Sequence, residues 1–138
     1  MTEVKICGMN SPAALKAAVR GGTNYIGLVF YGPSPRYIPL ETAVTFSGLA
    51  PDGVQVVGLF VDPSDEEIKG PVKYAWLDMI QLHGNESPAR VREIKEAFDV
   101  PVMKAFRIKT KDDLAQVDDY KDICDWFLFD SAPLQPLP

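Results

Sequence analysis

Short apolar segments alternate with helical segments along almost the whole chain, and this alternation constrains the fold more than any other feature. Strand-like apolar runs are predicted at residues 4–6, 25–30, 54–61, 79–83, 100–106 and 125–130. Helices are predicted between them at residues 11–20, 40–49, 87–98 and 111–117, with another that starts near residues 62–67. Because Gly70-Pro71 disfavours continuation of that helix, we expect it to be split, with a second piece near residues 72–77. The alternation predicts βαβ units and a parallel sheet, which is an α/β fold.

Length and charge narrow the class of protein further. A chain of 138 residues has room for one domain but not for a second independent core. The formal net charge is −5 and no basic stripe occurs, so we do not expect binding to nucleic acid. No apolar run is long enough to span a bilayer, and the start lacks the pattern of a signal peptide. We therefore expect a cytoplasmic protein without membrane contacts.

Cysteine and histidine usage gives little basis for a metal site. Cys7 and Cys124 are far apart in the sequence and form no CxxC pair, and the chain has one histidine. This cysteine usage is typical of cytoplasmic proteins, in which thiols are kept reduced.

Cys7 is the first candidate for chemistry. It ends the first apolar run, Gly8 follows it, and Ser11-Pro12 then opens a helix. This order predicts that the thiol lies at the carboxyl end of a strand, where open α/β sheets and α/β barrels carry their active sites. The alternative is a buried cysteine that acts as a small apolar residue.

Four further polar side chains are predicted at the same edge of the sheet. Arg36 follows the second strand, His83 and Asp130 end the fourth and sixth strands, and Gln81 shares the sheet face of His83. Together with Cys7 they suit a small anionic substrate and a proton transfer. Alternatives remain for single residues: His83 could cap a strand, Arg36 could be a surface cation, and Asp130 could cap a helix.

Lys5 and Lys104 are unusual because each lies inside a predicted strand. A lysine in a strand is costly unless its ammonium group reaches water or a partner. Either side chain could point into the mouth of a barrel or could extend along the surface to solvent.

Five segments resemble successive strand motifs of one enzyme family, in order and over most of the chain. They are Lys5-Ile6-Cys7-Gly8, residues 27–37 with Pro33-Ser34-Pro35-Arg36-Tyr37, residues 57–61, Gln81-Leu82-His83-Gly84 and Leu128-Phe129-Asp130-Ser131. The combination resembles phosphoribosylanthranilate isomerase, the (β/α)8 TIM-barrel enzyme of tryptophan biosynthesis.

The resemblance implies an activity and a role for each candidate residue. The reaction would be the Amadori rearrangement of N-(5-phosphoribosyl)anthranilate to the 1-deoxyribulose 5-phosphate enolamine. Cys7 would be the general base that takes the C2 proton of the ribose, and Asp130 would be the general acid that protonates the ring oxygen. Arg36 would face the anthranilate carboxylate, and Gln81 and His83 would line the substrate site. The resemblance calls for no metal and no organic cofactor.

The resemblance also implies an incomplete barrel of about six parallel strands with flanking helices. We expect residues 1–131 to form this partial barrel, residues 132–138 to be a proline-rich tail, and the family's strands seven and eight with their phosphate loops to be missing. Unpaired sheet edges would favour self-association or pairing with a complementing fragment, and turnover would be weak or absent. A catalytically silent fragment that serves as a binding or assembly module is the alternative. Another phosphosugar barrel with different chemistry is a third option.

Overall fold

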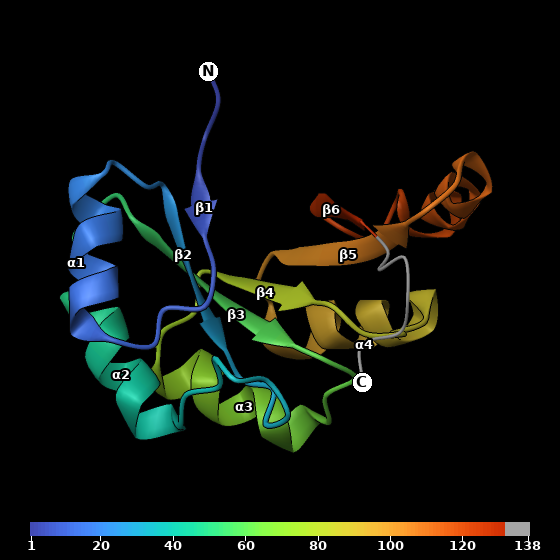
Figure 1. Cartoon of the computed structure of the whole chain (residues 1–138). Coiled ribbons are helices and arrows are strands. Elements are labelled where there is room, and N and C mark those ends of the chain that lie inside the picture. The colour runs from blue at the N-terminus through green and yellow to red at the C-terminus, as the bar shows by residue number, and fades with distance from the viewer. Residues whose placement is uncertain (132–138) are drawn as a thin grey trace.

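Within residues 1–131, six parallel strands form one sheet, and their order in the sheet is their order in the chain (Figure 1). The computed structural model of the chain describes residues 1–131, so the predicted tail at residues 132–138 lies outside the described residues. The strands are β1 (Lys5–Ile6), β2 (Tyr25–Val29), β3 (Gln55–Phe60), β4 (Met79–Leu82), β5 (Val102–Ile108) and β6 (Trp126–Ser131). The helices are α1 (Pro12–Arg20), α2 (Leu40–Leu49), α3 (Asp65–Tyr74), α4 (Pro88–Phe98) and the 3₁₀ helix η1 (Lys111–Tyr120). The predicted α/β fold with six parallel strands is confirmed.

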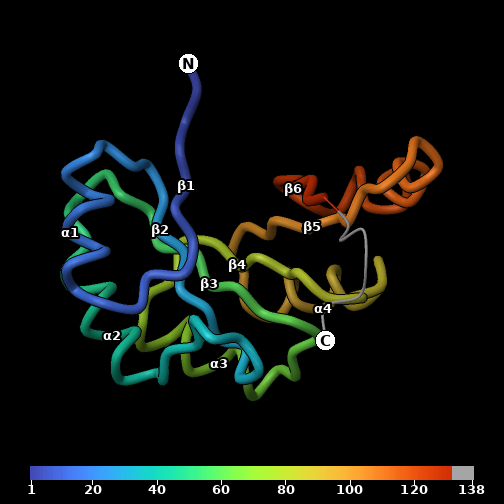
Figure 2. Tube along the Cα trace, viewed as in Figure 1, coloured from blue at the N-terminus to red at the C-terminus, as the bar shows by residue number. Residues whose placement is uncertain are grey.

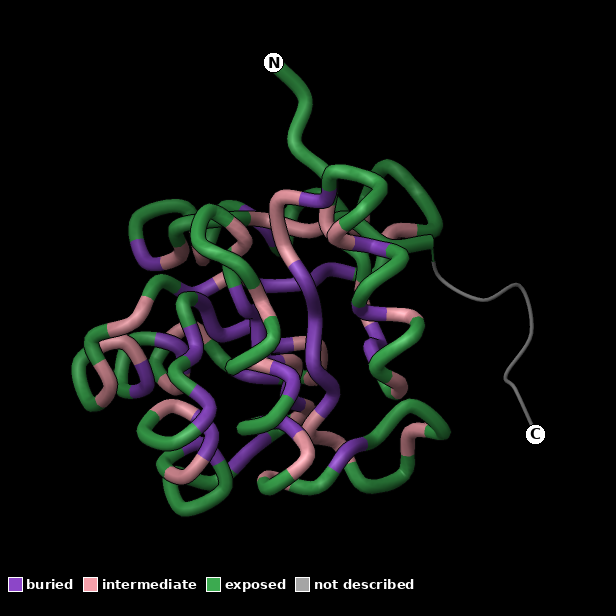
Figure 3. Tube along the Cα trace, turned by 90° about the vertical axis from the view of Figure 1, so that its left-hand side faces the viewer, coloured by how far each residue is buried: buried purple, intermediate pink, exposed green. Residues whose placement is uncertain are grey.

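The helices cover one face of the sheet, and the main core lies between the helices and that face. Alternate strand residues such as Ile26, Leu28 and Ile80 are buried in one cluster with the helix residues Leu15 and Phe46. Figure 3 shows these buried stretches in purple at the centre of the molecule, while the outer turns of the helices are green. Because side chains alternate across a strand, the residues between these positions face the opposite side of the sheet. That inner face carries the candidate site.

The sheet curls around its inner face and forms a half-barrel. The rings of Tyr25 on β2 and Trp126 on β6 lie 6.4 Å apart although three strands separate them in the sheet. In the part of the chain that the structure describes, β1 and β6 are the two edges of the sheet, and both lie on the upper side of the trace in Figure 2. The curl brings carboxyl ends of distant strands within reach of one another.

Three polar side chains fix the starts of alternate strands. They lie directly before β2, β4 and β6, and each bonds to the start of the preceding strand. Asn24, Asp78 and Asp125 accept hydrogen bonds from the backbone N–H groups of Val4, Val56 and Val102, at 2.8 to 2.9 Å. These bonds satisfy backbone donors at the amino ends of β1, β3 and β5. The amino edge of the sheet is therefore fixed by structural polar groups, and the carboxyl edge is left for the site.

The prediction that the third helix is split was wrong. Helix α3 runs unbroken through Gly70 and Pro71. A proline clashes mainly with the Cβ and N–H of the residue before it, and Gly70 has no Cβ. A capping box between Ser64 and Glu67 stabilises the first turn, and the buried Pro71 packs with the core.

Two other elements differ from the prediction by two residues or more. Strand β5 begins and ends two residues later than expected, at Val102 and Ile108, and the weak fifth helix is the 3₁₀ helix η1. The shift brings Arg107 into the strand. In residues 1–131 no helix is long and apolar enough to cross a membrane.

Candidate active site

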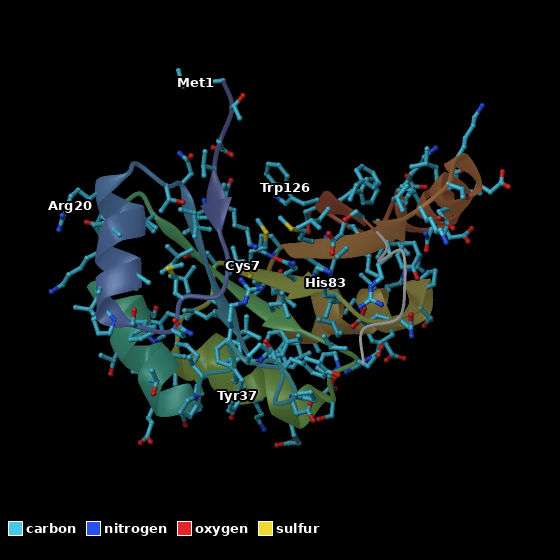
Figure 4. The ribbon with its side chains drawn as sticks, in the orientation of Figure 1. Met1, Cys7, Arg20, Tyr37, His83 and Trp126 are labelled. Carbon is cyan, nitrogen blue, oxygen red and sulfur yellow. The ribbon has the colours of Figure 1, made fainter. Side chains whose placement is uncertain are left out.

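Cys7 directly follows β1, and two close contacts with glycines fix its surroundings (Figure 4). A Cβ atom at Gly27 on β2 would lie 2.8 Å from Cys7 Sγ, so only glycine leaves room for the thiol over this strand. The backbone N–H of Gly8 donates to the carbonyl of Gly27 at 3.0 Å. The thiol is partly exposed and free of any disulfide.

The Arg36 side chain approaches Cys7 from the loop after β2. Its Nη1 donates to the backbone carbonyl of Cys7 at 3.3 Å. A Cβ at Gly8 would lie 2.5 Å from Arg36 Cδ, and Gly8 has φ of +80°, so both the contact and the backbone favour glycine. A guanidinium held here supplies a cation with donors free for a carboxylate.

Gln81, His83 and Asp130 form a second group. Gln81 lies within β4, His83 follows that strand, and Asp130 lies on β6. Gln81 Nε2 is 3.1 Å from His83 Nδ1, and His83 Nε2 is 3.3 Å from Asp130 Oδ2. Residues from two different strands therefore meet at the carboxyl edge of the inner face.

A polar cavity of about 460 Å³ opens beside His83 at the ends of β3, β4 and β5. Asp62, Arg107 and Tyr120 are among its lining residues. Arg107 is the register partner of Asp130, so the two side chains leave neighbouring strands on the same face. Arg107 was not predicted as a site residue because the strand was expected to end at Phe106. The alternation of side chains through Ile108 was the signal for it.

Lys104 does not extend along the surface to solvent: it is among the residues lining the polar cavity, and its ammonium group has a buried partner there. Its side chain is 4% exposed, and its Nζ lies 3.0 Å from Oε1 of Glu86, whose side chain is 1% exposed. The Glu86 carboxylate also accepts the backbone N–H groups of Asp62 and Gly84, and Lys104 donates to the carbonyl of Gly84. This buried pair joins β5 to the segments that follow β3 and β4.

Proteins of known sequence and structure resemble this chain closely. The family model described as N-(5'phosphoribosyl)anthranilate (PRA) isomerase matches residues 4–134. This chain belongs to the PRA isomerase family. The five candidate residues all lie in the matched region, and the resemblance noted in the sequence is confirmed.

Individual members of the family support the assignment. The N-(5'-phosphoribosyl)anthranilate isomerases of Rhodospirillum centenum and Rhodopseudomonas palustris are each 46% identical over 94% of this chain. The chain spans about 60% of the length of these curated relatives. The crystal structure of phosphoribosyl anthranilate isomerase from Thermotoga maritima superposes with a TM-score of 0.89 and 33% identity, over 98% of this chain and 64% of that one.

A second structure of the family contains a ligand. It is a phosphoribosyl anthranilate isomerase in complex with reduced 1-(o-carboxyphenylamino)-1-deoxyribulose 5-phosphate. It superposes with a TM-score of 0.87 and 33% identity, over 96% of this chain and 66% of that one. The half-barrel of six strands therefore matches the TIM-barrel fold of the PRA isomerase family.

Proposed function

We propose that this chain carries the acid and base of the PRA isomerase reaction, with Asp130 as the general acid and Cys7 as the general base. The observation that carries the proposal is the contact of His83 with Asp130, which holds a carboxyl group at the mouth of the half-barrel. Cys7 occupies the equivalent position after β1, on the same edge of the sheet. A thiol and a carboxyl at one edge are suitable partners for acid–base catalysis.

The chemistry proceeds in two proton transfers. Asp130 gives its proton to the ring oxygen of the phosphoribosyl group, the bond from C1 to that oxygen breaks, and an iminium ion forms. The Cys7 thiolate then takes the C2 proton, and the C–H electron pair becomes the C1–C2 double bond of the enolamine. Nitrogen regains its lone pair, so one proton has entered at oxygen and one has left from carbon.

Arg36 gives the substrate its orientation in this proposal. Its guanidinium lies beside Cys7 and can pair with the carboxylate of the anthranilate ring. The proposed substrate is therefore a phosphosugar joined to an aromatic amino acid, similar in chemistry to the ligand of the related structure. Gln81 and His83 line the sugar side. The proposed base is a free thiol, which suits the reducing conditions of the cytoplasm.

The rate of turnover tests the proposal, and it is measured as the decay in fluorescence of substrate generated in solution. We expect slow turnover that Cys7→Ala and Asp130→Asn each reduce by at least about 100-fold, because general acid–base groups contribute on that scale. Asp122→Asn is the matched control, since Asp122 is an exposed carboxylate away from the site. Turnover that is indifferent to Cys7→Ala and Asp130→Asn would refute the assignment.

A silent binding or assembly module is the second candidate, and the sheet edges favour it. Apolar side chains are exposed on both edge strands, with Ile6 39% exposed on β1 and Trp126 and Phe129 46% and 57% exposed on β6. Such edges pair readily with a second copy or with a complementing segment. Light scattering after size-exclusion chromatography tests this: a stable, cooperatively folded monomer would count against pairing through the edges.

A further inference from the structure

The hydrogen bonds from Gln81 through His83 to Asp130 form one directed chain. An amide nitrogen can only donate, so Gln81 Nε2 at 3.1 Å makes His83 Nδ1 an acceptor. A neutral imidazole with an accepting Nδ1 carries its proton on Nε2. That Nε2–H points at Asp130 Oδ2, 3.3 Å away. The amide of Gln81 therefore decides which nitrogen of His83 holds the proton.

With Asp130 ionised, the reverse arrangement fails at the Asp130 end of these hydrogen bonds. If the amide of Gln81 were turned over, its oxygen would face Nδ1 and would require a proton there. Nε2 would then present a lone pair to the ionised Asp130 carboxylate, and two acceptors would face each other. Only the arrangement with Nε2–H suits Asp130 Oδ2 whether the carboxyl group is ionised or carries its proton on Oδ1.

The side chain of Gln81 is enclosed by the sheet, and His83 is the one hydrogen-bond partner of its amide among the described residues, since Oε1 has none. Gln81 is 1% exposed, and its register neighbours are the apolar Leu59 on β3 and Met103 on β5. The exposed fraction of the side chain rises to 21% at His83 and 49% at Asp130. The hydrogen bonds therefore lead from a rigid, buried strand position to a carboxyl group that solvent and substrate can reach.

We propose that Gln81 is a positioning residue that sets the tautomer of His83 and, through it, the orientation of Asp130. This inference rests on the proposed function, in which Asp130 is the acid. His83 Nε2–H engages Oδ2, so Oδ1 carries the proton that passes to the ring oxygen. Gln81 thereby acts on the acid through His83.

The chain has a single histidine, so nitrogen-15 NMR of the imidazole reports on His83 alone. We measure the chain without substrate, at a pH where the ring is neutral. We expect protonated Nε2, unprotonated Nδ1, and a scalar coupling between Nδ1 and the side-chain nitrogen of Gln81. A protonated Nδ1, or absence of that coupling, would overturn the inference without any variant and without any assay of turnover.

Variants extend the test. Gln81→Met has a similar volume but no donor, and we expect it to remove the coupling and mix the two tautomers. Gln55→Met is the matched control, because Gln55 is exposed at the start of β3, and it should leave the imidazole spectrum unchanged. An unchanged spectrum in Gln81→Met would contradict the inference.

Turnover gives an independent measurement. Gln81→Met should lower kcat roughly 10-fold to 100-fold with little change in KM, as loss of an orienting partner does. In an Asp130→Asn background it should have no further effect, because Gln81 acts through Asp130. A further loss in that background would contradict the inference. No turnover in the parent would refute the proposed function but would leave the NMR result standing.

Discussion

The buried pair of Lys104 and Glu86 offers a direct test of how the carboxyl edge of the sheet is held. Lys104 Nζ donates to Glu86 Oε1, to the carbonyl of Gly84 and to the carbonyl of Ala105, at 2.9 to 3.1 Å. Lys104→Met removes all three bonds and leaves the Glu86 carboxylate buried without its cation. Removal of one partner from a buried pair costs about 3–5 kcal/mol. For a chain of this length that corresponds to a fall in Tm of roughly 10 °C or more.

Urea unfolding, followed by circular dichroism and tryptophan fluorescence at one fixed protein concentration, measures this loss. Lys16→Met, at an exposed helix position, is the control and should change the free energy of unfolding by less than about 0.5 kcal/mol. Glu86→Gln combined with Lys104→Met should cost less than the sum of the two single changes, because the paired charges are coupled. A loss below about 1 kcal/mol for Lys104→Met would show that the buried pair does not hold this part of the sheet.

Three further predictions follow from single contacts. Gly27→Ala places a Cβ 2.8 Å from Cys7 Sγ, so it should displace the thiol and cost about 1–3 kcal/mol of stability; an unfolding midpoint equal to that of the parent would contradict the contact. Burial raises the pKa of the Cys124 thiol to about 11, so iodoacetamide at about pH 8 should spare Cys124, and mass spectrometry of Cys7→Ala should show almost no adduct. Burial opposes ionisation of Asp125, but hydrogen bonds from Lys95 and from a backbone N–H outweigh it and lower the pKa of Asp125 below its ordinary value. Asp125→Asn should therefore cost about 1 kcal/mol at neutral pH, and its deficit in urea midpoint should shrink as the pH falls toward ~3; a deficit that stays constant would contradict this.

Much of the fold follows from local patterns in the sequence. Apolar runs and capping residues were sufficient to predict six strands in a parallel sheet, because each depends on neighbouring residues only. The continuous helix α3 was missed because the rule for the residue before proline assumes a Cβ, which Gly70 lacks. The shift of β5 was missed because Val100-Pro101 is as apolar as the strand itself, so composition did not mark the strand's start.

The candidate site was predictable in its members but not in its contacts. The alternation of side chains places Gln81 and His83 on one face from spacing alone. The contact of His83 with Asp130 depends on the curl of the sheet, which brings together residues 47 positions apart. The burial of Lys104 depends in the same way on Glu86, which comes from the loop before α4. Long-range register and curvature decide both contacts, and neither has a local sequence signal.

Loss of deuterium from ribose C2 of the labelled substrate tests whether Cys7 is the base, because that bond breaks only if a base reaches it. We expect the parent chain to release the label to water and Cys7→Ala to slow release by at least about 100-fold. Asp130→Asn should slow it as much, because the ring must open first. Release of the label by Cys7→Ala at the rate of the parent chain would contradict the account.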